Sequence, residues 1–448
     1  MTVTEHTTAA SGDADPGLTS EGAQEMEPRA LAGGVEVLRE VGSVLRMSEA
    51  EAAEYTSAPD EAETTIINMG PQHPSTHGVL RLLLELDGEI IVNLASDIGF
   101  LHTGIEKSME SKTYTKALVM TDRMDYLSPM SNNLGYILAV EKLLGIEAPP
   151  RAQAIRVILT ELARVSSHLV WLATHALDLA AMSVFLYCFR EREYILDLFE
   201  MVAGQRMMVS YFRPGGLWRD VPEEFEPAVR KFLDFFPARI ADYEALLKNN
   251  PIWLSRTKGI GVVTAEQAVA WGLTGASLRG SGVQWDIRKA MPYCGYEQYD
   301  FEVPTSTVGD VYARYRVRMA EMWQSLRIIE QALDKLPAGP FRADDRKIVP
   351  PPRSELGHSM EAVIHHFKLW TEGFSAPKGY VYQSIEAPRG EFACYLRGDG
   401  SPKPARVHFR APSYVNLASL PWMAKNVFVA DLVAIIGSID IVLGEIDR

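Results

Sequence analysis

The sequence contains few cysteines and few basic residues. Its three cysteines, Cys188, Cys294 and Cys394, lie far apart among 448 residues, so they form neither a C-x-x-C pair nor a disulfide framework. They cannot by themselves ligate an iron-sulfur cluster or a structural zinc ion. Lys and Arg number 44 against 58 Asp and Glu, which gives a formal charge of −14. We therefore expect no binding to nucleic acid, which requires a basic surface for the phosphates.

An apolar leader is also absent from the first residues, MTVTEHTTAA, so we expect no secretory signal. One stretch, from His168 to Phe189, has the length to span a bilayer. It contains His175 and Asp178, however, and charged residues stand on both sides of it. We therefore interpret it as part of a central core helix, and we expect that the chain does not cross a membrane.

The negative charge is concentrated near the N-terminus. Residues 1–64 contain 14 acidic residues, three arginines and no lysine, a charge of −11, which leaves −3 for residues 65–448. The low apolar content predicts that residues 1–62 form an acidic, largely disordered extension, and that residues 63–448 form one folded domain. A body this close to neutral is expected to be covered by partner proteins.

Residues 65–448 show the periodicity of strands, then helices, then strands. Residues 65–97 predict strands, with Asp87 and Gly88 in a hairpin turn. The expected helices span 132–145, 151–204, 223–248, 310–336 and 359–371, and strands return over 380–409. This order indicates an α+β fold, a central helical bundle flanked by small N-terminal and C-terminal β elements. No dinucleotide fingerprint or P-loop occurs, so we expect no NAD or ATP site.

The expected central helix carries polar residues within an apolar sequence. Their separations of 3, 4, 7 and 3 residues place neighbours on one helix face; they are Glu161, Arg164, His168, His175 and Asp178. Asp178 stands in the apolar run LDLAAM, where an ionised carboxylate needs a partner. These residues fit a structural buried ion pair, a metal-binding cluster, or a carboxylate that orients a catalytic histidine.

Two further segments are candidates for a site. Residues 70–81, GPQHPSTHGVLR, carry His73 and His77 among prolines and glycines, which predicts a loop rather than a helix. Such a loop is suited to holding a polar group of a ligand, but it also fits a turn stabilised by its own side chains. Residues 122–126, DRMDY, read alone as a polar segment that caps the next helix.

The sequence closely resembles the D-type subunits, the large quinone-site subunits, of the proton-translocating NADH:quinone oxidoreductase, respiratory complex I. The resemblance covers about residues 63–448, and its motifs occur in the same order: GPQHPSTHGVLR, GFLHTGIEKSMESKTY, TDRMDYLSPM, PPRAQAIRVILTELARVSSHL and the terminal DR. It implies a fold like that of the [NiFe] hydrogenase large subunit. The hydrogenase metal is held by thiolates, and the corresponding positions here carry Asp125, Ser128, Val442 and Glu445. We therefore expect no metal site.

The resemblance also implies roles for individual residues. His77 and Tyr126 would hydrogen-bond the two carbonyl oxygens of the quinone, and Asp178 would pair with His77. Thr174 and His73 are weaker candidates for the wall of the pocket.

Arg164 and His168 would lie behind the pocket, on the side of a partner's cluster. The resemblance implies no cofactor bound by this chain, with quinone as substrate and the electrons supplied by an iron-sulfur cluster in a neighbouring subunit.

The implied partners are the cluster-bearing subunit at the quinone site, the C-type partner, and the membrane subunit at the quinone channel. The implied place is the peripheral arm of the complex, at the cytoplasmic face of the bacterial cell membrane. The chain would act as an enzyme, a translocase, only within this assembly. Two alternatives are a purely structural scaffold and a degenerate [NiFe] hydrogenase-like subunit.

Overall fold

The structure, a computed structural model, describes residues 27–30, 36–39 and 64–448. The chain divides into two units, Met1–Thr64 and Thr65–Arg448. In the first unit, β1 (Glu27–Ala30) pairs with β2 (Glu36–Arg39) in antiparallel register. The predicted disorder of residues 1–62 otherwise falls outside the described residues and stays a prediction.

The second unit opens with a three-stranded antiparallel sheet, as predicted. The strands are β3 (Thr65–Met69), β4 (Arg81–Asp87) and β5 (Ile90–Asp97), in the order β3-β4-β5. The β4–β5 turn contains Gly88, whose φ of +60° suits glycine. The connection between β3 and β4 contains the short 3-10 helix η2 (Pro74–Thr76), so the residue 70–81 segment is a loop, as expected.

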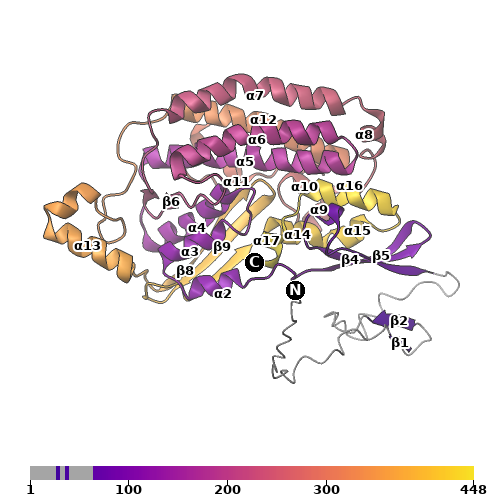
Figure 1. Cartoon of the computed structure of the whole chain (residues 1–448), viewed down its shortest axis with the longest axis horizontal. Helices are drawn as coiled ribbons and strands as arrows, with labels where there is room; N and C mark the ends of the chain where they lie inside the picture. The colour runs from indigo at the N-terminus through magenta and orange to yellow at the C-terminus, as the bar shows by residue number, and fades with distance from the viewer. Residues whose placement is uncertain (1–26, 31–35, 40–63) are drawn as a thin grey trace, which may run out of the picture. The chain divides into compact units, whose positions relative to one another are not determined.

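Long helices form the layer that follows. They are α4 (Pro129–Leu144), α5 (Pro150–Asp178), α6 (Met182–Ala203), α7 (Phe225–Leu247) and α12 (Val311–Asp334), and α5, α6, α7 and α12 lie together at the top of Figure 1. The middle of α5, from Ile155 to Ala173, is buried, because neighbouring elements cover every side of it. This confirms a core helix at the centre of the chain.

The prediction of one helical segment over residues 151–204 is wrong in one respect. The helix α5 ends at Asp178, and α6 begins at Met182 and packs along α5. Ala180 adopts φ +67°, and the backbone N–H of Ala181 donates to Ala176 O at 2.7 Å. The sequence contains neither glycine nor proline at this turn, so it gives no signal for the break. No helix among the described residues is long and apolar enough to cross a membrane.

A second antiparallel sheet follows the helices, as predicted. It contains β8 (Gly379–Ala387), β9 (Gly390–Gly398) and β10 (Arg406–Arg410), in the order β10-β9-β8. Helix α4 packs on β8 and β9. A Cβ atom on Gly135 of α4 would lie 2.7 Å from the ring of Phe392, so the glycine permits this close approach.

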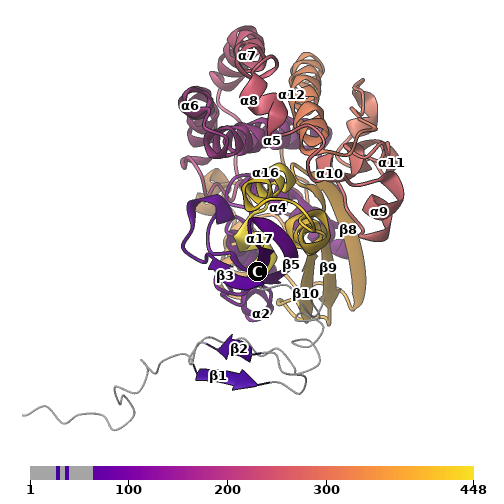
Figure 2. The same ribbon diagram turned by 90° about the vertical axis from the view of Figure 1, so that its right-hand side faces the viewer.

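Four short helices complete the chain and were not predicted. They are α14 (Pro412–Ala418), α15 (Leu420–Met423), α16 (Val429–Ile439) and α17 (Leu443–Asp447). In Figure 2, α16 and α17 lie between the N-terminal sheet and the long helices. Leu432, Ile436 and Leu443 belong to a hydrophobic core shared with β4, so the C-terminus holds the first sheet in place.

Shorter elements connect these layers. The helical ones are α2 (Ile105–Glu110), α3 (Tyr114–Thr121), α8 (Pro251–Ser255), α9 (Ala265–Ala270), α10 (Ala276–Arg279), α11 (Ile287–Ala290), η3 (Tyr296–Gln298), η4 (Arg353–Gly357) and α13 (Met360–Thr371). The strands β6 (Phe212–Arg213) and β7 (Gly216–Leu217) form a small hairpin. The fold is therefore α+β, as predicted, with a helical centre between two small sheets.

Candidate functional site

The loop between β3 and β4 forms hydrogen bonds within itself and carries His77. The Thr76 hydroxyl donates to His73 O at 2.8 Å, and the Nδ1 atom of His73 accepts from the Ser75 N–H at 3.2 Å. His77 adopts a left-handed conformation with φ +54°. A Cβ atom on Gly78 would lie 2.9 Å from Leu443 Cδ1, so the loop packs directly on α17. The loop thus stabilises itself and also fixes the position of His77.

His77 and Asp178 are brought into contact by this arrangement. The Nε2 atom of His77 lies 3.2 Å from Oδ2 of Asp178, and the two side chains are only 14% and 13% exposed. This is an ion-pair distance, although the two groups are not aligned as a hydrogen bond. Asp178 is the last residue of α5 rather than an interior one. The end of a long helix therefore presents its carboxylate to the loop.

His175 lies one turn before Asp178 and is fully buried. Its ring stacks on Trp171 at 5.7 Å and meets the edge of Trp253 at 5.2 Å. Burial, together with the nearby imidazole of His77, lowers the pKa of His175 to about 3. A neutral, apolar-packed imidazole therefore stands close to the His77–Asp178 pair. The sequence placed His175 in the polar stripe but gave no reason to single it out.

Tyr126 lies in the connection between α3 and α4 and is half-buried. Burial raises the pKa of its phenol, and Arg389 beside it partly opposes this shift. A Cβ atom on Gly444 would lie 2.6 Å from Met124 O, so α17 packs closely against this connection. Helix α17 thus contacts the His77 loop through Leu443 and the Tyr126 segment through Gly444.

Several buried acidic residues lie around Arg389, next to Tyr126. Arg389 donates to Asp125 Oδ2 at 2.6 Å and lies 3.4 Å from Asp440 Oδ1. Glu445 accepts from the Ser413 N–H at 2.7 Å, and its other oxygen has no hydrogen-bond partner among residues 64–448. Burial and the nearby Asp125 raise the pKa of Glu445 to about 7. Asp125 and Glu445, two of the residues expected from the resemblance at thiolate positions, therefore lie close enough to interact electrostatically.

Ser128 and Val442, the other two residues expected from the resemblance at thiolate positions, form hydrogen bonds within the chain itself. The hydroxyl oxygens of Ser128 and Ser131 lie 2.7 Å apart, and the Val442 N–H donates to the Ser413 hydroxyl at 3.3 Å. Over residues 64–448, no group of three His, Cys, Asp or Glu side chains has the arrangement of a metal site.

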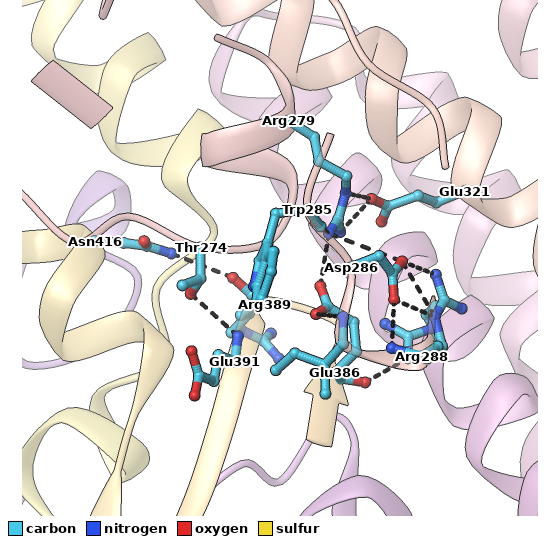
Figure 3. A network of polar contacts seen from close by, with 12 residues as sticks. Thr274, Arg279, Trp285, Asp286, Arg288, Glu321, Glu386, Arg389, Glu391 and Asn416 are labelled. Atoms are coloured by element: carbon cyan, nitrogen blue, oxygen red, sulfur yellow. Dashed lines mark hydrogen bonds and ion pairs between the residues drawn. The ribbon is translucent and has the colours of Figure 1, made fainter. Parts of the chain in front are cut away.

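A chain of buried ion pairs extends behind this group, partly drawn in Figure 3. Arg279 bridges Glu321 and Glu386 at 2.6 and 2.7 Å, and Arg288 lies 2.7 Å from Asp286. Each carboxylate faces at least one guanidinium, as buried charges require.

Arg164 and His168 belong to this buried network. Arg164 donates to Glu161 at 3.1 Å, and His168 Nε2 lies 3.0 Å from Glu321. Although burial alone raises the pKa of Glu161, the guanidiniums of Arg164 and Arg288 lower it to about 2. These contacts match the structural ion pair, one of the alternatives that the sequence left open for this part of the stripe.

Thr174 and His73 have local hydrogen bonds. The Thr174 hydroxyl donates to Val170 O at 3.0 Å within its own helix. His73 is exposed and caps η2. Neither side chain contributes to the contact between His77 and Asp178, so each could form part of a pocket wall but not of the ion pair.

The chain is similar to known proteins over most of its length. A family described as "Respiratory-chain NADH dehydrogenase, 49 Kd subunit" matches residues 178–448. An NADH-quinone oxidoreductase D-type subunit from Roseiflexus sp. (strain RS-1) is 65% identical over 391 residues, which are 87% of this chain and 94% of the relative. The protein of the same description from Chloroflexus aurantiacus is 65% identical over 389 residues, 86% of this chain and 95% of the relative.

A relative from another organism gives the same result. The NADH-quinone oxidoreductase D-type subunit from Geotalea uraniireducens is 59% identical over 386 residues, which are 86% of this chain and 99% of the relative. The identity and the coverage together exceed what a shared fold alone would give. The chain therefore belongs to the family of NADH-quinone oxidoreductase D-type subunits, the 49 kDa subunits of respiratory complex I, and is one component of an oxidoreductase complex.

Proposed function

We propose that this subunit forms the pocket that binds the quinone headgroup, next to an iron-sulfur cluster carried by a neighbouring subunit. In this proposal the pocket supports two-electron reduction of quinone, coupled to proton translocation, in the peripheral arm at the cytoplasmic face of the membrane. The observation that carries the proposal is the contact of His77 with Asp178, together with the packing of α17 against both the His77 loop and the Tyr126 segment.

His77 is suited to donate a proton to one quinone carbonyl. Histidine is a common proton donor in catalysis, and the carboxylate of Asp178 lies 3.2 Å from the Nε2 atom of His77. The left-handed backbone and the packing of Gly78 fix the ring's place, so little reorganisation is needed when a ligand binds. Proton donation from His77 leaves Asp178 beside a neutral ring.

Tyr126 is suited to the second carbonyl. Because burial raises the pKa of its phenol, the hydroxyl stays protonated at neutral pH and can donate a hydrogen bond. A developing quinol anion would draw the proton from it. Arg389 and Asp125 lie beside the segment and set its electrostatic environment. Two donors from different segments match the two carbonyl oxygens of a quinone.

The electrons in this proposal come from a partner. The three cysteines of the chain are separate and unpaired, and Cys188 and Cys394 are buried. An iron-sulfur cluster therefore needs a ligand set from another chain. The proposed partners are the cluster-bearing subunit, the C-type partner and the membrane subunit at the quinone channel.

The same contact offers a route to energy coupling. When His77 gives up its proton, the charge at the end of α5 changes, because Asp178 loses its cationic neighbour. We further propose that this rearrangement of charge is the signal that reaches the membrane subunits and triggers proton pumping. Thr174, in the last turns of α5, and His73 would form part of the pocket wall.

Tyr126→Phe in the assembled complex tests the proposed function. It removes the phenolic donor and keeps the ring. We expect quinone reduction to fall by about 10²-fold or more, the usual contribution of general acid catalysis, while NADH oxidation by an artificial acceptor persists. Tyr312→Phe, in α12, is the matched control and should leave quinone reduction unchanged. Unchanged quinone reduction in Tyr126→Phe would contradict the role of Tyr126.

A further inference from the structure

Helix α13 presents an apolar stripe to solvent within residues 64–448. The stripe comprises Met360, Val363, Ile364, Phe367 and Trp370, which are 75, 41, 51, 66 and 62% exposed. Their spacing places them along one side of the helix. Figure 1 shows α13 at the edge of the second unit, away from the bundle of long helices. Scattered exposed apolar residues are ordinary, but a continuous stripe marks an interaction site.

A small cavity adjoins the last turn of α13. Its volume is about 100 Å³, and Leu369 and Trp370 of α13 line one side. Arg213 of β6 lines it too, together with Trp218 and Arg342 from neighbouring loops. Trp370 therefore belongs both to the stripe and to the cavity, so the two features are continuous.

Both arginines of the cavity donate hydrogen bonds to backbone oxygens. Arg213 donates to the backbone oxygens of Ser210 and Phe212, and Arg342 donates through Nε to Leu217 O at 2.9 Å. Neither forms an ion pair within residues 64–448. Two partly buried guanidiniums that form no ion pair are unfavourable, which predicts that an anion joins them.

Asp122, whose charge acts on Arg213, is already engaged by other groups. Asp122 accepts from Asn133 Nδ2 at 2.5 Å and from the Ser210 hydroxyl. Burial lowers the pKa of Arg213 to about 10, and Asp122 only partly opposes this shift. Burial also lowers the pKa of Arg342. Both guanidiniums still carry their charge at neutral pH, so the need for an external anion remains.

The backbone around the arginines is closely packed. The N–H of Ala343 donates to Gly215 O at 2.7 Å, and the N–H of Leu217 donates to Phe341 O at 3.2 Å. A Cβ atom on Gly216 would lie 2.3 Å from Phe341 O, so only glycine permits this approach. The two arginine-bearing segments are thus joined to each other, which sets the distance between their side chains before a ligand arrives.

We propose that the α13 stripe and the cavity form one docking surface for another subunit of the complex. The bound segment would place an aspartate, a glutamate or a C-terminal carboxylate between Arg213 and Arg342, and its apolar side chains would cover the stripe. Guanidiniums bind carboxylates in paired hydrogen bonds, and aromatic and arginine side chains are enriched at interfaces. The inference does not depend on the quinone pocket.

The charges of α13 favour a protein partner over a lipid surface. Helices that lie on membranes carry many Lys or Arg residues on the polar side. Helix α13 has one lysine, Lys368, and one glutamate, Glu361, so these two charges cancel. A small cavity with two guanidiniums and two tryptophans also suits one carboxylate better than a flat array of headgroups.

Photo-crosslinking in the assembled complex tests the docking surface. A benzophenone amino acid replaces Phe367 in the full-length chain, and the matched control carries it at Val269 of α9, which is 61% exposed. We expect the probe at position 367, but not the probe at position 269, to crosslink to a peptide of another subunit. That peptide should contain a carboxylate beside apolar residues. Crosslinks only to lipid, only to a second copy of this chain, or to no protein would overturn the proposal.

Charge exchange tests the carboxylate directly. Arg342→Glu should lower the yield of intact complex about tenfold, and changing the crosslinked acidic residue to arginine should restore it. If the crosslinked carboxylate is a C-terminus, it cannot be exchanged for arginine. Amidation of that C-terminus should then lower the yield of intact complex as Arg342→Glu does. Phe367→Ser separates folding from docking, because this exposed side chain should leave the melting temperature of the free chain unchanged while assembly falls. Normal assembly in both single variants, or no rescue by the exchange, would overturn the proposal.

Discussion

The Nε2 atom of His77 lies 3.2 Å from Oδ2 of Asp178, although His77 belongs to the loop after β3 and Asp178 is the last residue of α5. The contact is well shielded from water, which strengthens the electrostatic interaction between the groups. It joins the small N-terminal sheet to the helical centre. A change of charge on either side chain therefore changes the electrostatic environment of both the sheet and the helical centre.

Asp178→Asn should lower the rate of quinone reduction. The variant removes the carboxylate that lies 3.2 Å from the Nε2 atom of His77, so the ring should be held less firmly in the position from which it donates a proton to quinone. The measurement is quinone reduction by the assembled complex, with NADH oxidation by an artificial acceptor as the reference. Asp334→Asn, an exposed aspartate on α12, is the control and should keep the wild-type rate. Unchanged quinone reduction in Asp178→Asn would count against the pairing.

His175→Phe should reduce the sensitivity of the fold to acid. The pKa of His175 is about 3 in the folded chain, below its ordinary value, so the unfolded chain binds the extra proton first as the pH falls. This contribution to stability is present above pH 6.5 and is lost below it, by about 2 kcal/mol between pH 7 and pH 5.

Denaturant unfolding of the full chain at pH 7 and pH 5 measures this difference. Phenylalanine keeps the ring contacts with Trp171 and Trp253 and cannot be protonated, so the variant should lose less stability than the wild type. His358→Phe, at an exposed histidine, should lose as much stability as the wild type does. Equal losses in His175→Phe and the wild type would contradict the buried neutral imidazole.

Glu445→Gln should change stability in the opposite pH direction. The pKa of Glu445 is about 7 in the folded chain, above its ordinary value, so its contribution to stability is present below about pH 4.3 and is lost as pH rises through 7. The amide cannot ionise and still accepts from the Ser413 N–H. The free energy of unfolding of the variant, relative to wild type, should rise by about 2.5 kcal/mol between pH 5 and pH 8.

The same unfolding measurement with Glu330→Gln is the control for that prediction. Glu330 is exposed on α12, so its substitution should give no such rise. A Glu445→Gln variant whose relative stability does not change with pH would show that Glu445 does not hold a proton in the folded chain near neutral pH.

Much of the fold could be predicted from the sequence because strands, turns and long helices leave local patterns. Apolar runs over residues 65–97 and 380–409, with Asp87-Gly88 in the first hairpin turn, predicted both sheets. The break after Asp178 could not be predicted, because Ala180 adopts a conformation for which alanine has no preference. The C-terminal helices could not be predicted either, because short helices depend on burial in the tertiary fold rather than on intrinsic helix propensity.

The site could be predicted only in part. The spacing of the central helix predicted polar residues on one face, but it could not separate Arg164 and His168, in the buried network, from Asp178, at the loop. That difference depends on which distant segment packs against each turn. The resemblance, rather than the spacing, paired His77 with Asp178. The burial of Glu445 depends on the tertiary packing of the C-terminus and left no local signal.

Photoaffinity labelling of the assembled complex tests the central claim most directly. A quinone analogue with a photoreactive group on the ring is irradiated with and without excess native quinone, and the labelled peptides are identified by mass spectrometry. The quinone pocket proposed here predicts label within residues 70–81 or 122–128 that disappears when excess quinone competes. Competed label that falls only in other segments of the chain or only in other subunits would contradict it.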